Sequence, residues 1–233
     1  MGKYVVNGIN LWIPRQVVTK KLRDALTSER YERSEAAALT QHLLPDDRML
    51  DLGSGAGYLA ALSARVVGGA AILGLEASKV MADAAQLNLD RNDGCGGRII
   101  WGAVVPDAFT DDTVKLNVGR AFWASSLMET GYLPDVTQVD VPAMRIGTLL
   151  SSHRPTVISI DVEGGELALF DTPLPEFVRL VVMEVHPAIY GPRGVKRVFD
   201  GLSASGLAYC PQGSRGSTVV FERVAEGPSG FCT

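Results

Sequence analysis

Hydrophobic positions along the chain follow two spacings, and the change between them predicts alternating strands and helices. Short, almost continuous apolar runs are typical of buried strands, whereas apolar positions three or four residues apart are typical of helices. The expected strands are Met49–Leu52, Ala71–Leu75, Arg98–Val105, Val157–Ile160 and Leu180–Met183, and the expected helices include Ser34–Leu44, Ala56–Val67 and Lys79–Leu89. Buried strands separated by helices predict a mostly parallel sheet that helices cover on both faces.

Three segments depart from this alternation. Gly206–Cys210 and Ser217–Glu222 flank a glycine-containing loop, so we expect an antiparallel hairpin that completes the sheet. In the N-terminal segment, residues 1–44, bases are interleaved with acids, which predicts amphipathic helical structure. Residues 106–155 are too long for a plain connection, so we expect either a functional lid over the substrate or a small insertion. Residues 225–233 are expected to form a mobile tail.

The composition fits one globular domain spanning residues 1–233. Of these residues 46% are hydrophobic and 21% charged, which is enough to bury a core. The formal net charge of -4 argues against nonspecific binding to nucleic acid or to an anionic membrane. The three cysteines are widely spaced, which suits a reducing cytosol better than a disulfide framework or a zinc site. Without a recognisable signal peptide, we expect a cytoplasmic protein.

The first motif with chemical meaning is rich in glycine. Asp51-Leu52-Gly53-Ser54-Gly55-Ala56-Gly57 follows an apolar strand and opens a helix. Glycines in that position let a ligand approach the backbone, and the first N–H groups of the helix point toward it. Tyr58 stands where a dinucleotide-binding loop needs its last glycine, which disfavours a nicotinamide cofactor.

An acid follows this motif at the end of the next expected strand. Glu76 lies 19 residues after Gly57, where a carboxylate accepts hydrogen bonds from both hydroxyls of a ribose. Loop and acid together predict an adenosine ligand without a pyrophosphate, and S-adenosylmethionine fits because its cationic sulfonium tolerates nearby acids. The alternative is a plain glycine turn and a surface glutamate. The residues expected to bind the cofactor are Asp51, Gly53, Ser54, Gly55, Gly57, Glu76 and Ala77.

Two later strands are also followed by polar groups. Val157–Ile160 leads into Asp161, Glu163 and Glu166, and Leu180–Met183 leads into Glu184 and His186. Because parallel strands open a crevice at their carboxyl ends, we expect these groups in one cleft with the glycine loop. The alternative is a core histidine with carboxylates that cap helices, as Glu166 would cap the helix after it.

The order of these segments is similar to that of a known family. The segments are Tyr31-Glu32, Asp51–Gly57, Ser125-Ser126-Leu127, Asp161-Val162-Glu163-Gly164-Gly165-Glu166 and Glu184-Val185-His186. In this respect the chain resembles the FkbM-type methyltransferases over about residues 31–222. The first loop departs from the family's usual Asp-Val-Gly-Ala-Asn-x-Gly. The resemblance implies a class I methyltransferase fold, which is an α/β Rossmann-like sheet with a C-terminal antiparallel hairpin and helices on both faces.

The resemblance also implies an activity and further contacts. Members of the family depend on S-adenosylmethionine and usually methylate hydroxyls on sugars, polyketides or other secondary metabolites. Glu32 would border the cofactor pocket and pair with the cofactor's amino group. The backbone of Ala103, at the end of an expected strand, would meet the adenine edge, and Asp161 would also touch the cofactor. Apart from the resemblance, aromatic side chains beside hydroxyls in the insertion suit a sugar or polyketide, so substrate contacts are expected at Trp123, Ser125 and Ser126; a small hydrophobic core under the insertion is the alternative. Glu166 and Glu184 are the other expected substrate contacts.

A hydroxyl is a poor nucleophile, so a base is useful in this reaction. His186 has the most suitable intrinsic pKa, and Asp161 and Glu163 are the alternatives. The same three residues with Glu184 would suit Mg²⁺ or Mn²⁺, but we expect the carboxylates to bind substrate or cap helices, so a metal is not expected.

The expected partner is a small molecule that carries a hydroxyl, with no nucleic acid and no membrane, and the sequence leaves room for a homo-oligomer. Three other readings remain: an RNA or protein methyltransferase on the same fold, a cofactor-binding protein without catalysis, and a nicotinamide oxidoreductase.

Overall fold

A seven-stranded sheet forms the centre of the protein in a computed structural model that describes residues 1–118 and 137–224. The strand order is β11-β12-β10-β9-β3-β4-β5. Strands β5, β4, β3, β9 and β10 run parallel, and β12 is antiparallel to both β10 and β11. This confirms the expected parallel sheet with a C-terminal hairpin. The strands are β3 (Met49–Leu52), β4 (Ile72–Glu76), β5 (Arg98–Trp101), β9 (Val157–Ile160), β10 (Leu180–Glu184), β11 (Leu207–Arg215) and β12 (Thr218–Arg223).

Strand order reverses between β3 and β9. From β3 the chain adds β4 and β5 on one side, and then returns to place β9 and β10 on the other side. At such a reversal the connections leave in opposite directions and open a crevice at the carboxyl ends of the strands. The glycine loop after β3 and the acidic segment after β9 both begin at this point.

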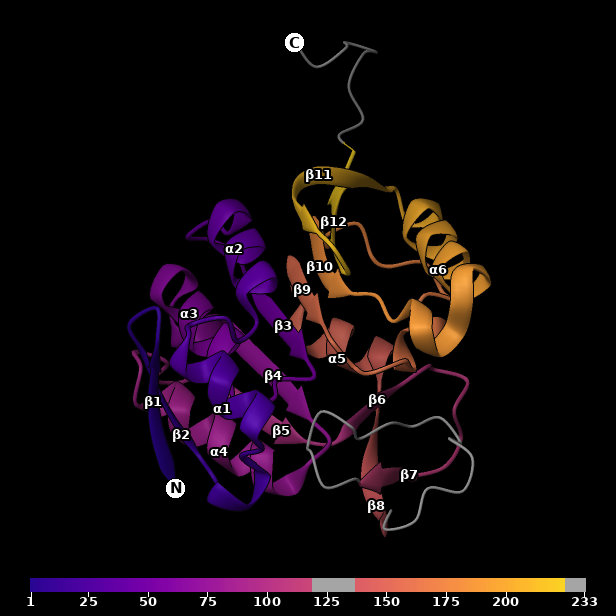
Figure 1. Cartoon of the computed structure of the whole chain (residues 1–233). Helices are drawn as coiled ribbons and strands as arrows, with labels where there is room; N and C mark the ends of the chain where they lie inside the picture. Colours follow the sequence, from indigo (N-terminus) through magenta and orange to yellow (C-terminus); the bar gives the residue numbers. More distant parts are fainter. Residues whose placement is uncertain (119–136, 225–233) are drawn as a thin grey trace.

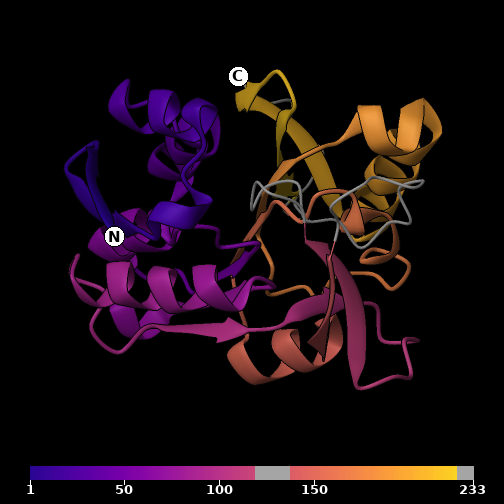
Figure 2. The same cartoon turned by 60° about the horizontal axis from the view of Figure 1, so that its bottom comes forward.

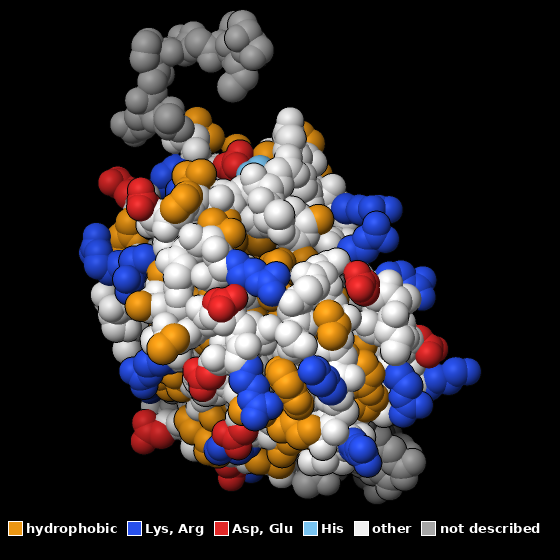
Figure 3. Space-filling model, turned by 90° about the vertical axis from the view of Figure 1, so that its left-hand side faces the viewer, with side chains coloured by type: hydrophobic (Ala, Val, Ile, Leu, Met, Phe, Trp, Pro, Cys, Tyr) orange, Lys and Arg blue, Asp and Glu red, His pale blue; other side chains and the backbone are white. Residues whose placement is uncertain are grey.

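Two layers of helices enclose the sheet (Figures 1 and 2). Successive side chains of a strand point to opposite faces. Met49 and Val157 therefore join the core beneath one layer, while Leu50 and Ile158 join the other. The first layer holds α1 (Lys20–Thr27), α2 (Arg33–His42), α3 (Tyr58–Val67) and α4 (Lys79–Asp90), and the second holds α5 (Ile146–His153) and α6 (Pro187–Ala204). Figure 3 shows that basic and acidic side chains are interspersed over the side of the molecule that carries the first layer.

The N-terminal segment corrects the expectation of helical structure over residues 1–44. Residues 2–13 form an antiparallel hairpin of β1 (Gly2–Val6) and β2 (Ile9–Ile13), and helical structure begins after it. Alternate residues of β2 are fully buried beneath the hairpin, so the period there is that of a strand. The interleaved charges that suggested a helix start only at Lys20, in α1.

The region between β4 and β9 also differs from the expectation. Arg98–Val105 is not one strand, because Gly102 divides β5 from β6 (Ala103–Val105). Strand β6 pairs with β8 (Thr137–Arg145), which pairs with β7 (Thr113–Val118) in a second sheet of three strands. Helix α5 then leads into β9, so residues 146–153 belong to the main alternation and not to an insertion. The proposed lid and tail positions 119–136 and 225–233 lie outside the described residues.

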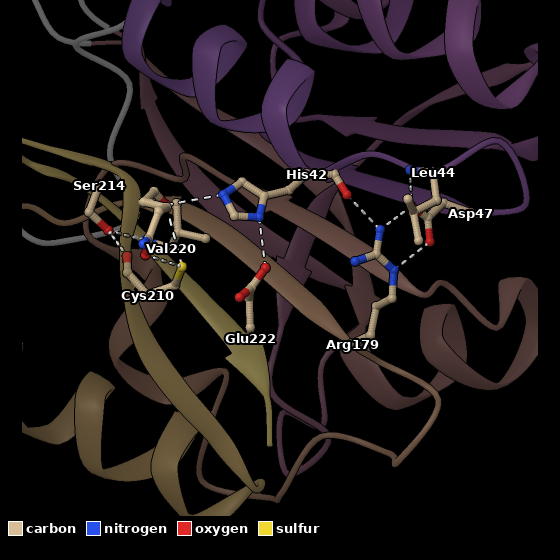
Figure 4. Close-up of polar contacts among 9 residues, drawn as sticks. His42, Leu44, Asp47, Arg179, Cys210, Ser214, Val220 and Glu222 are labelled. Carbon is tan, nitrogen blue, oxygen red and sulfur yellow. Dashed lines mark hydrogen bonds and ion pairs between the residues drawn. The ribbon is translucent and has the colours of Figure 1, made fainter. Parts of the chain in front are cut away.

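Polar contacts fasten α2 to the C-terminal hairpin (Figure 4). His42, at the end of α2, places Nδ1 2.7 Å from Oε1 of Glu222 and Nε2 3.1 Å from the carbonyl of Gln212. Arg179, just before β10, binds the carboxylate of Asp47 and donates to the carbonyl of His42 at 2.8 Å. These contacts tie the end of α2 and the segment before β3 to the C-terminal hairpin and the start of β10. A separate hydrogen bond from Thr218 to Glu35 holds the hairpin turn against the first turn of α2. Within the described residues, no helix is long and apolar enough to cross a membrane.

Candidate functional site

A cavity of about 760 Å³ opens at the carboxyl ends of the central strands. Its walls come from the glycine loop, the tips of β4, β9 and β10, the start of α2 and the turn between β11 and β12. The structure therefore brings together the segments that the sequence placed in one cleft. The predicted residues that line it are Glu32, Gly53, Gly55, Glu76, Ala77, Ala103, Asp161, Glu163, Glu184 and His186.

The glycine loop is shaped by close packing against its neighbours. The N–H groups of Gly53 and Ser54 donate to the carbonyl of Leu75 at 2.9 and 3.0 Å, which ties the loop to β4. Gly53 has a φ of +85°, and a Cβ there would overlap the carbonyl oxygen of Asp161. Only glycine fits this position, because it accepts positive φ and leaves room for the facing backbone. The close approach fixes the tip of β3 against the end of β9.

Glu76 is positioned by two backbone donors. Oε2 accepts from the N–H of Gly55 at 2.9 Å, and Oε1 accepts from the N–H of Ser78 at 2.7 Å. Burial raises the pKa of Glu76 to about 7; the bonds from Ser78 and Gly55 oppose this shift, and the charge of Asp51 adds to it. Each carboxylate oxygen still has a lone pair, so Glu76 can accept further hydrogen bonds from a ligand in the cavity.

Three residues expected at the cofactor lie behind the loop instead. Asp51, Ser54 and Gly57 are not part of the cavity wall, and Asp51 is only 2% exposed. Burial raises the pKa of Asp51 to about 6, while bonds from Ser54 and Ser159 oppose the shift. Asp51 shares a strand face with Met49, toward the first helix layer, so it supports the loop from below. The expectation of direct contact by these three residues is corrected to a role in shaping the loop.

The start of α2 contributes a second buried acid to the cavity. Glu32 caps this helix with a φ of +47°, a strained conformation for a residue with a side chain. Burial raises its pKa well above the usual value; a bond with Tyr31 opposes this, and the charges of Asp51, Glu35 and Asp161 add to it. An acid with little solvation is stabilised by a cationic ligand group. Its position is consistent with the expected pairing with an amino group, which stays a prediction.

His186 lies at the centre of an acid–histidine cluster with Asp161, Glu163 and Glu166. Its Nδ1 is 3.1 Å from Oε1 of Glu166, while its Nε2 is 3.4 Å from Oδ1 of Asp161 and 3.5 Å from Oε2 of Glu163. Glu166 is 0% exposed and does not line the cavity. It sits behind the imidazole, so the expected contact between Glu166 and substrate is wrong.

The charges in this cluster change the expected role of His186. Burial opposes a charge on its imidazole, but the hydrogen bond that it donates to Glu166 and the charges of Glu166, Asp161 and Glu163 raise its pKa to about 9. An imidazole that already holds a proton at neutral pH is a poor base. Burial and the nearby Glu163 and Glu184 raise the pKa of Asp161 well above its usual value. The carboxylates of Asp161 and Glu163 face the cavity, and their raised pKa values make each a stronger base than a solvated carboxylate once it is ionised.

The cavity is also lined by Glu35, Arg215, Ser217 and Thr218, which sequence reasoning missed. Glu184 accepts a hydrogen bond from the hydroxyl of Ser217 at 2.8 Å, and Glu35 accepts one from Thr218. Arg215, from the same hairpin turn, also lines the cavity. Glu35 lies one turn of α2 after Glu32, and this spacing is the only local feature of the sequence that could have predicted a place for Glu35 in the cavity. Trp123, Ser125 and Ser126, expected at the substrate, lie outside the described residues.

Residues 18–103 match the family model for protein-L-isoaspartate(D-aspartate) O-methyltransferase, which is less than half of the chain. No curated protein matches the chain. Among solved structures, precorrin-6y C5,15-methyltransferase from Geobacter metallireducens GS-15 is 11% identical, with coverage of 92% of this chain and 94% of that chain and a TM-score of 0.46. The ribosomal protein L11 methylase from Lactobacillus delbrueckii subsp. bulgaricus is 12% identical, with coverage of 84% and 80% and a TM-score of 0.48. TYW2 from M. jannaschii, solved in complex with AdoMet, is 12% identical, with coverage of 95% and 86% and a TM-score of 0.46.

The strand order itself defines the class of fold. The order of the parallel strands reverses between β3 and β9, and the last strand of the chain, β12, is antiparallel and lies between β10 and β11. This arrangement is the Rossmann-like fold of class I methyltransferases. The match of residues 18–103 supports the same general assignment to methyltransferases. These findings do not confirm the FkbM resemblance, which stays a prediction.

Proposed function

We propose that the protein is an S-adenosylmethionine-dependent methyltransferase that transfers a methyl group to a hydroxyl on a small molecule, such as a sugar or another secondary metabolite. The observation that carries this proposal is that one cavity joins two chemically different ends. Glu76 and the glycine loop form one end, and Asp161, Glu163 and His186 form the other. A methyl donor and its acceptor need such adjoining sites, because transfer requires the nucleophile, the methyl carbon and the sulfur in line.

The cofactor end suits adenosine and a cationic amino-acid tail. Glu76 would accept hydrogen bonds from the ribose hydroxyls, and the backbone of Ala103 would meet the adenine edge, as expected from the sequence. Glu32, on the opposite wall, would attract the ammonium group. The buried acids around this space make the cavity favourable for a ligand with net positive charge.

The acceptor end suits a neutral hydroxyl. In the proposed step, Asp161 or Glu163 takes the hydroxyl proton as the oxygen forms its bond to the methyl carbon. The carbon–sulfur bond breaks, and its electron pair stays on sulfur, which becomes a neutral thioether. An aspartate carboxylate, the acceptor in the name of the matched family, would meet like charges from Asp161, Glu163 and Glu184 here. This repulsion favours a hydroxyl over a carboxylate as the acceptor.

Two measurements test the proposal in sequence. Calorimetric titration with S-adenosylhomocysteine is expected to show one site, which the matched Glu76→Gln variant weakens. Transfer of labelled methyl from S-adenosylmethionine is then measured against hydroxyl compounds, with RNA and a protein mixture as comparison acceptors. A protein that binds no S-adenosylhomocysteine refutes the cofactor assignment. Binding without transfer to any hydroxyl favours a non-catalytic cofactor-binding protein, and transfer to RNA or protein favours those substrates.

A further inference from the structure

We propose that Asp161, Glu163 and His186 form a binding site for one divalent cation of the Mn²⁺ type, with Glu166 as the residue that orients the histidine. Each of the three residues has a ligand atom within 4.8 Å of a ligand atom of the other two. The contacts of Nε2 of His186 indicate Oδ1 of Asp161 and Oε2 of Glu163 as its partners in the site. Two carboxylates and one imidazole make a mixed oxygen and nitrogen donor set that Mn²⁺ accepts. The site reverses the expectation from the sequence that no metal binds.

The tautomer of His186 is the first argument. Glu166 is fully buried, and its Oε1 accepts hydrogen bonds from both the Val162 N–H, at 3.3 Å, and Nδ1 of His186, at 3.1 Å. The imidazole therefore carries a hydrogen on Nδ1, and the lone pair of a neutral ring lies on Nε2. That lone pair faces the carboxylates of Asp161 and Glu163. Such an arrangement is stable only with a positive charge between the three atoms, either a proton or a metal ion.

In the metal-free protein this positive charge is the proton on the imidazole, which a binding cation would displace, and the distances leave room for that exchange. A charge-assisted hydrogen bond from an imidazolium to a carboxylate is about 2.7–2.9 Å long. The two contacts of Nε2 are 3.4 and 3.5 Å, and the buried Oδ1 of Asp161 has no hydrogen-bond partner among the described residues. Neighbouring ligands around an ion at about 2.1–2.2 Å lie about 3 Å apart, so contraction by a few tenths of an ångström would complete the coordination. With the proton alone, both contacts stay long.

The surroundings also resemble those of a metal ligand. A metal-bound histidine almost always donates its other N–H to a carboxylate or carbonyl, which fixes its orientation and tautomer. Glu166 supplies that carboxylate, and its Oε2 also lacks a hydrogen-bond partner among the described residues. Asp161 and Glu163 are 33% and 31% exposed, so the ion would be reached from the cavity and keep positions for water or acceptor oxygens. Glu184 is not in the ligand set, because its Oε1 accepts from Ser217 and the residue is not among the three whose ligand atoms lie within 4.8 Å of one another.

The site itself does not depend on the cofactor, but its chemical use rests on the proposed function. With a cation bound, Asp161 and Glu163 would act through the ion instead of taking the proton themselves. The cation would lower the pKa of a hydroxyl that coordinates it, so that the proton leaves to water, and it would hold that oxygen in a fixed direction. The substrate class would then be a molecule with an acceptor hydroxyl and a second oxygen beside it, because two adjacent open positions bind such a pair together. This makes a vicinal diol a better acceptor than an isolated hydroxyl.

The test is Mn²⁺ binding to the purified full chain without cofactor, followed by electron paramagnetic resonance of free Mn²⁺. We expect one saturable site, at least tenfold weaker in Asp161→Asn and 10–100-fold weaker in Glu166→Gln. Glu35→Gln, which removes an acid from the same cavity but not from the cluster, is the matched control and is expected to stay within twofold. Thermal melting shows that each variant is folded. Absence of saturable binding, or equal binding in Asp161→Asn, overturns the proposal.

A second measurement uses only the wild-type protein, so it does not depend on whether a variant folds. Pulsed resonance of Mn²⁺ bound to the wild type is expected to show coupling to a nitrogen nucleus of imidazole, and bound Mn²⁺ without that coupling overturns the ligand set. Titration with S-adenosylhomocysteine on the same preparation separates the two proposals. Cofactor binding without a Mn²⁺ site refutes the metal site alone, and a Mn²⁺ site without cofactor binding refutes the proposed function alone.

Discussion

Replacement of Glu76 by glutamine separates ligand binding from protein stability. The change keeps the shape of the side chain but replaces one acceptor oxygen with an NH₂ group. Both oxygens of Glu76 now accept from backbone N–H groups, those of Gly55 and Ser78. One of these donors would face the new NH₂ group and lose its partner, and both ribose hydroxyls of the proposed cofactor would lose a charged acceptor.

The expected loss of affinity for S-adenosylhomocysteine follows from these contacts. A hydrogen bond to a charged group contributes about 1.5–3 kcal/mol. Loss of the charge weakens two ribose contacts, so we expect Glu76→Gln to reduce affinity for S-adenosylhomocysteine by about 3 kcal/mol, or about 100-fold. The stability of the free protein should change in the opposite direction at high pH. A carboxyl whose pKa is raised to about 7 destabilises the fold as pH rises above its unfolded value, and glutamine removes that effect.

The assay is calorimetric titration between pH 6 and pH 8, together with thermal melting without ligand. Wild-type affinity is expected to rise with pH across this interval, because the ionised carboxylate is the better acceptor. The Glu76→Gln variant should show a flat profile and a melting temperature at pH 8 no lower than that of the wild type. Equal affinities in the two proteins, or the same pH profile, would refute the assignment of Glu76 to the ribose.

Three further changes test the framework of the site. Gly53→Ala should prevent stable folding, because its Cβ overlaps the Asp161 carbonyl, whereas Gly216→Ala, with φ +63° and open space, should cost only about 1–2 kcal/mol in chemical denaturation. Asp47→Ala should lower the free energy of unfolding by about 2–3 kcal/mol at pH 7, because it leaves Arg179 unpaired. The difference between variant and wild type should shrink below about pH 4, because the wild-type Asp47 carboxyl, whose pKa is lowered, then becomes protonated as well. A difference that does not change with pH contradicts this. Burial and Arg48 lower the pKa of His153, so wild-type stability should fall as pH drops below about 6.5, and His153→Gln should reduce that fall.

The central sheet could be predicted from the sequence because its strands are buried on both faces. Met49–Leu52 and Val157–Ile160 agree with the structure to the residue, since apolar runs bounded by a turn leave little freedom in their ends. The N-terminal hairpin could not be predicted in the same way. Its two short strands bury only alternate residues, and the neighbouring charges of α1 dominated the pattern. Gly102 likewise divides two strands within one apolar run.

The sequence predicts which residues of the site lie at the carboxyl ends of the strands, but not which way their side chains point. Topology places Glu76, Asp161 and His186 together at the carboxyl ends of the strands, because each ends or follows a parallel strand of the same sheet. Which way a side chain points depends on packing that no local pattern records. Glu166 turns into the core behind His186, and Asp51 turns beneath the loop, although both belong to the most recognisable motifs. The hairpin turn at Arg215–Thr218 reaches the cavity through long-range contacts with α2.

The shifted carboxylates together indicate how the cavity favours its ligand. Burial raises the pKa of Glu32, Glu76 and Asp161, so each prefers to hold a proton or to meet a positive charge. This arrangement destabilises the free protein, because like charges share a poorly solvated space. S-adenosylmethionine carries one more positive charge than S-adenosylhomocysteine, since the sulfonium becomes a neutral thioether. For the proposed cofactor, the acids would stabilise the methyl donor more than its product, and the proposed transfer would remove a positive charge from the ligand, which favours release.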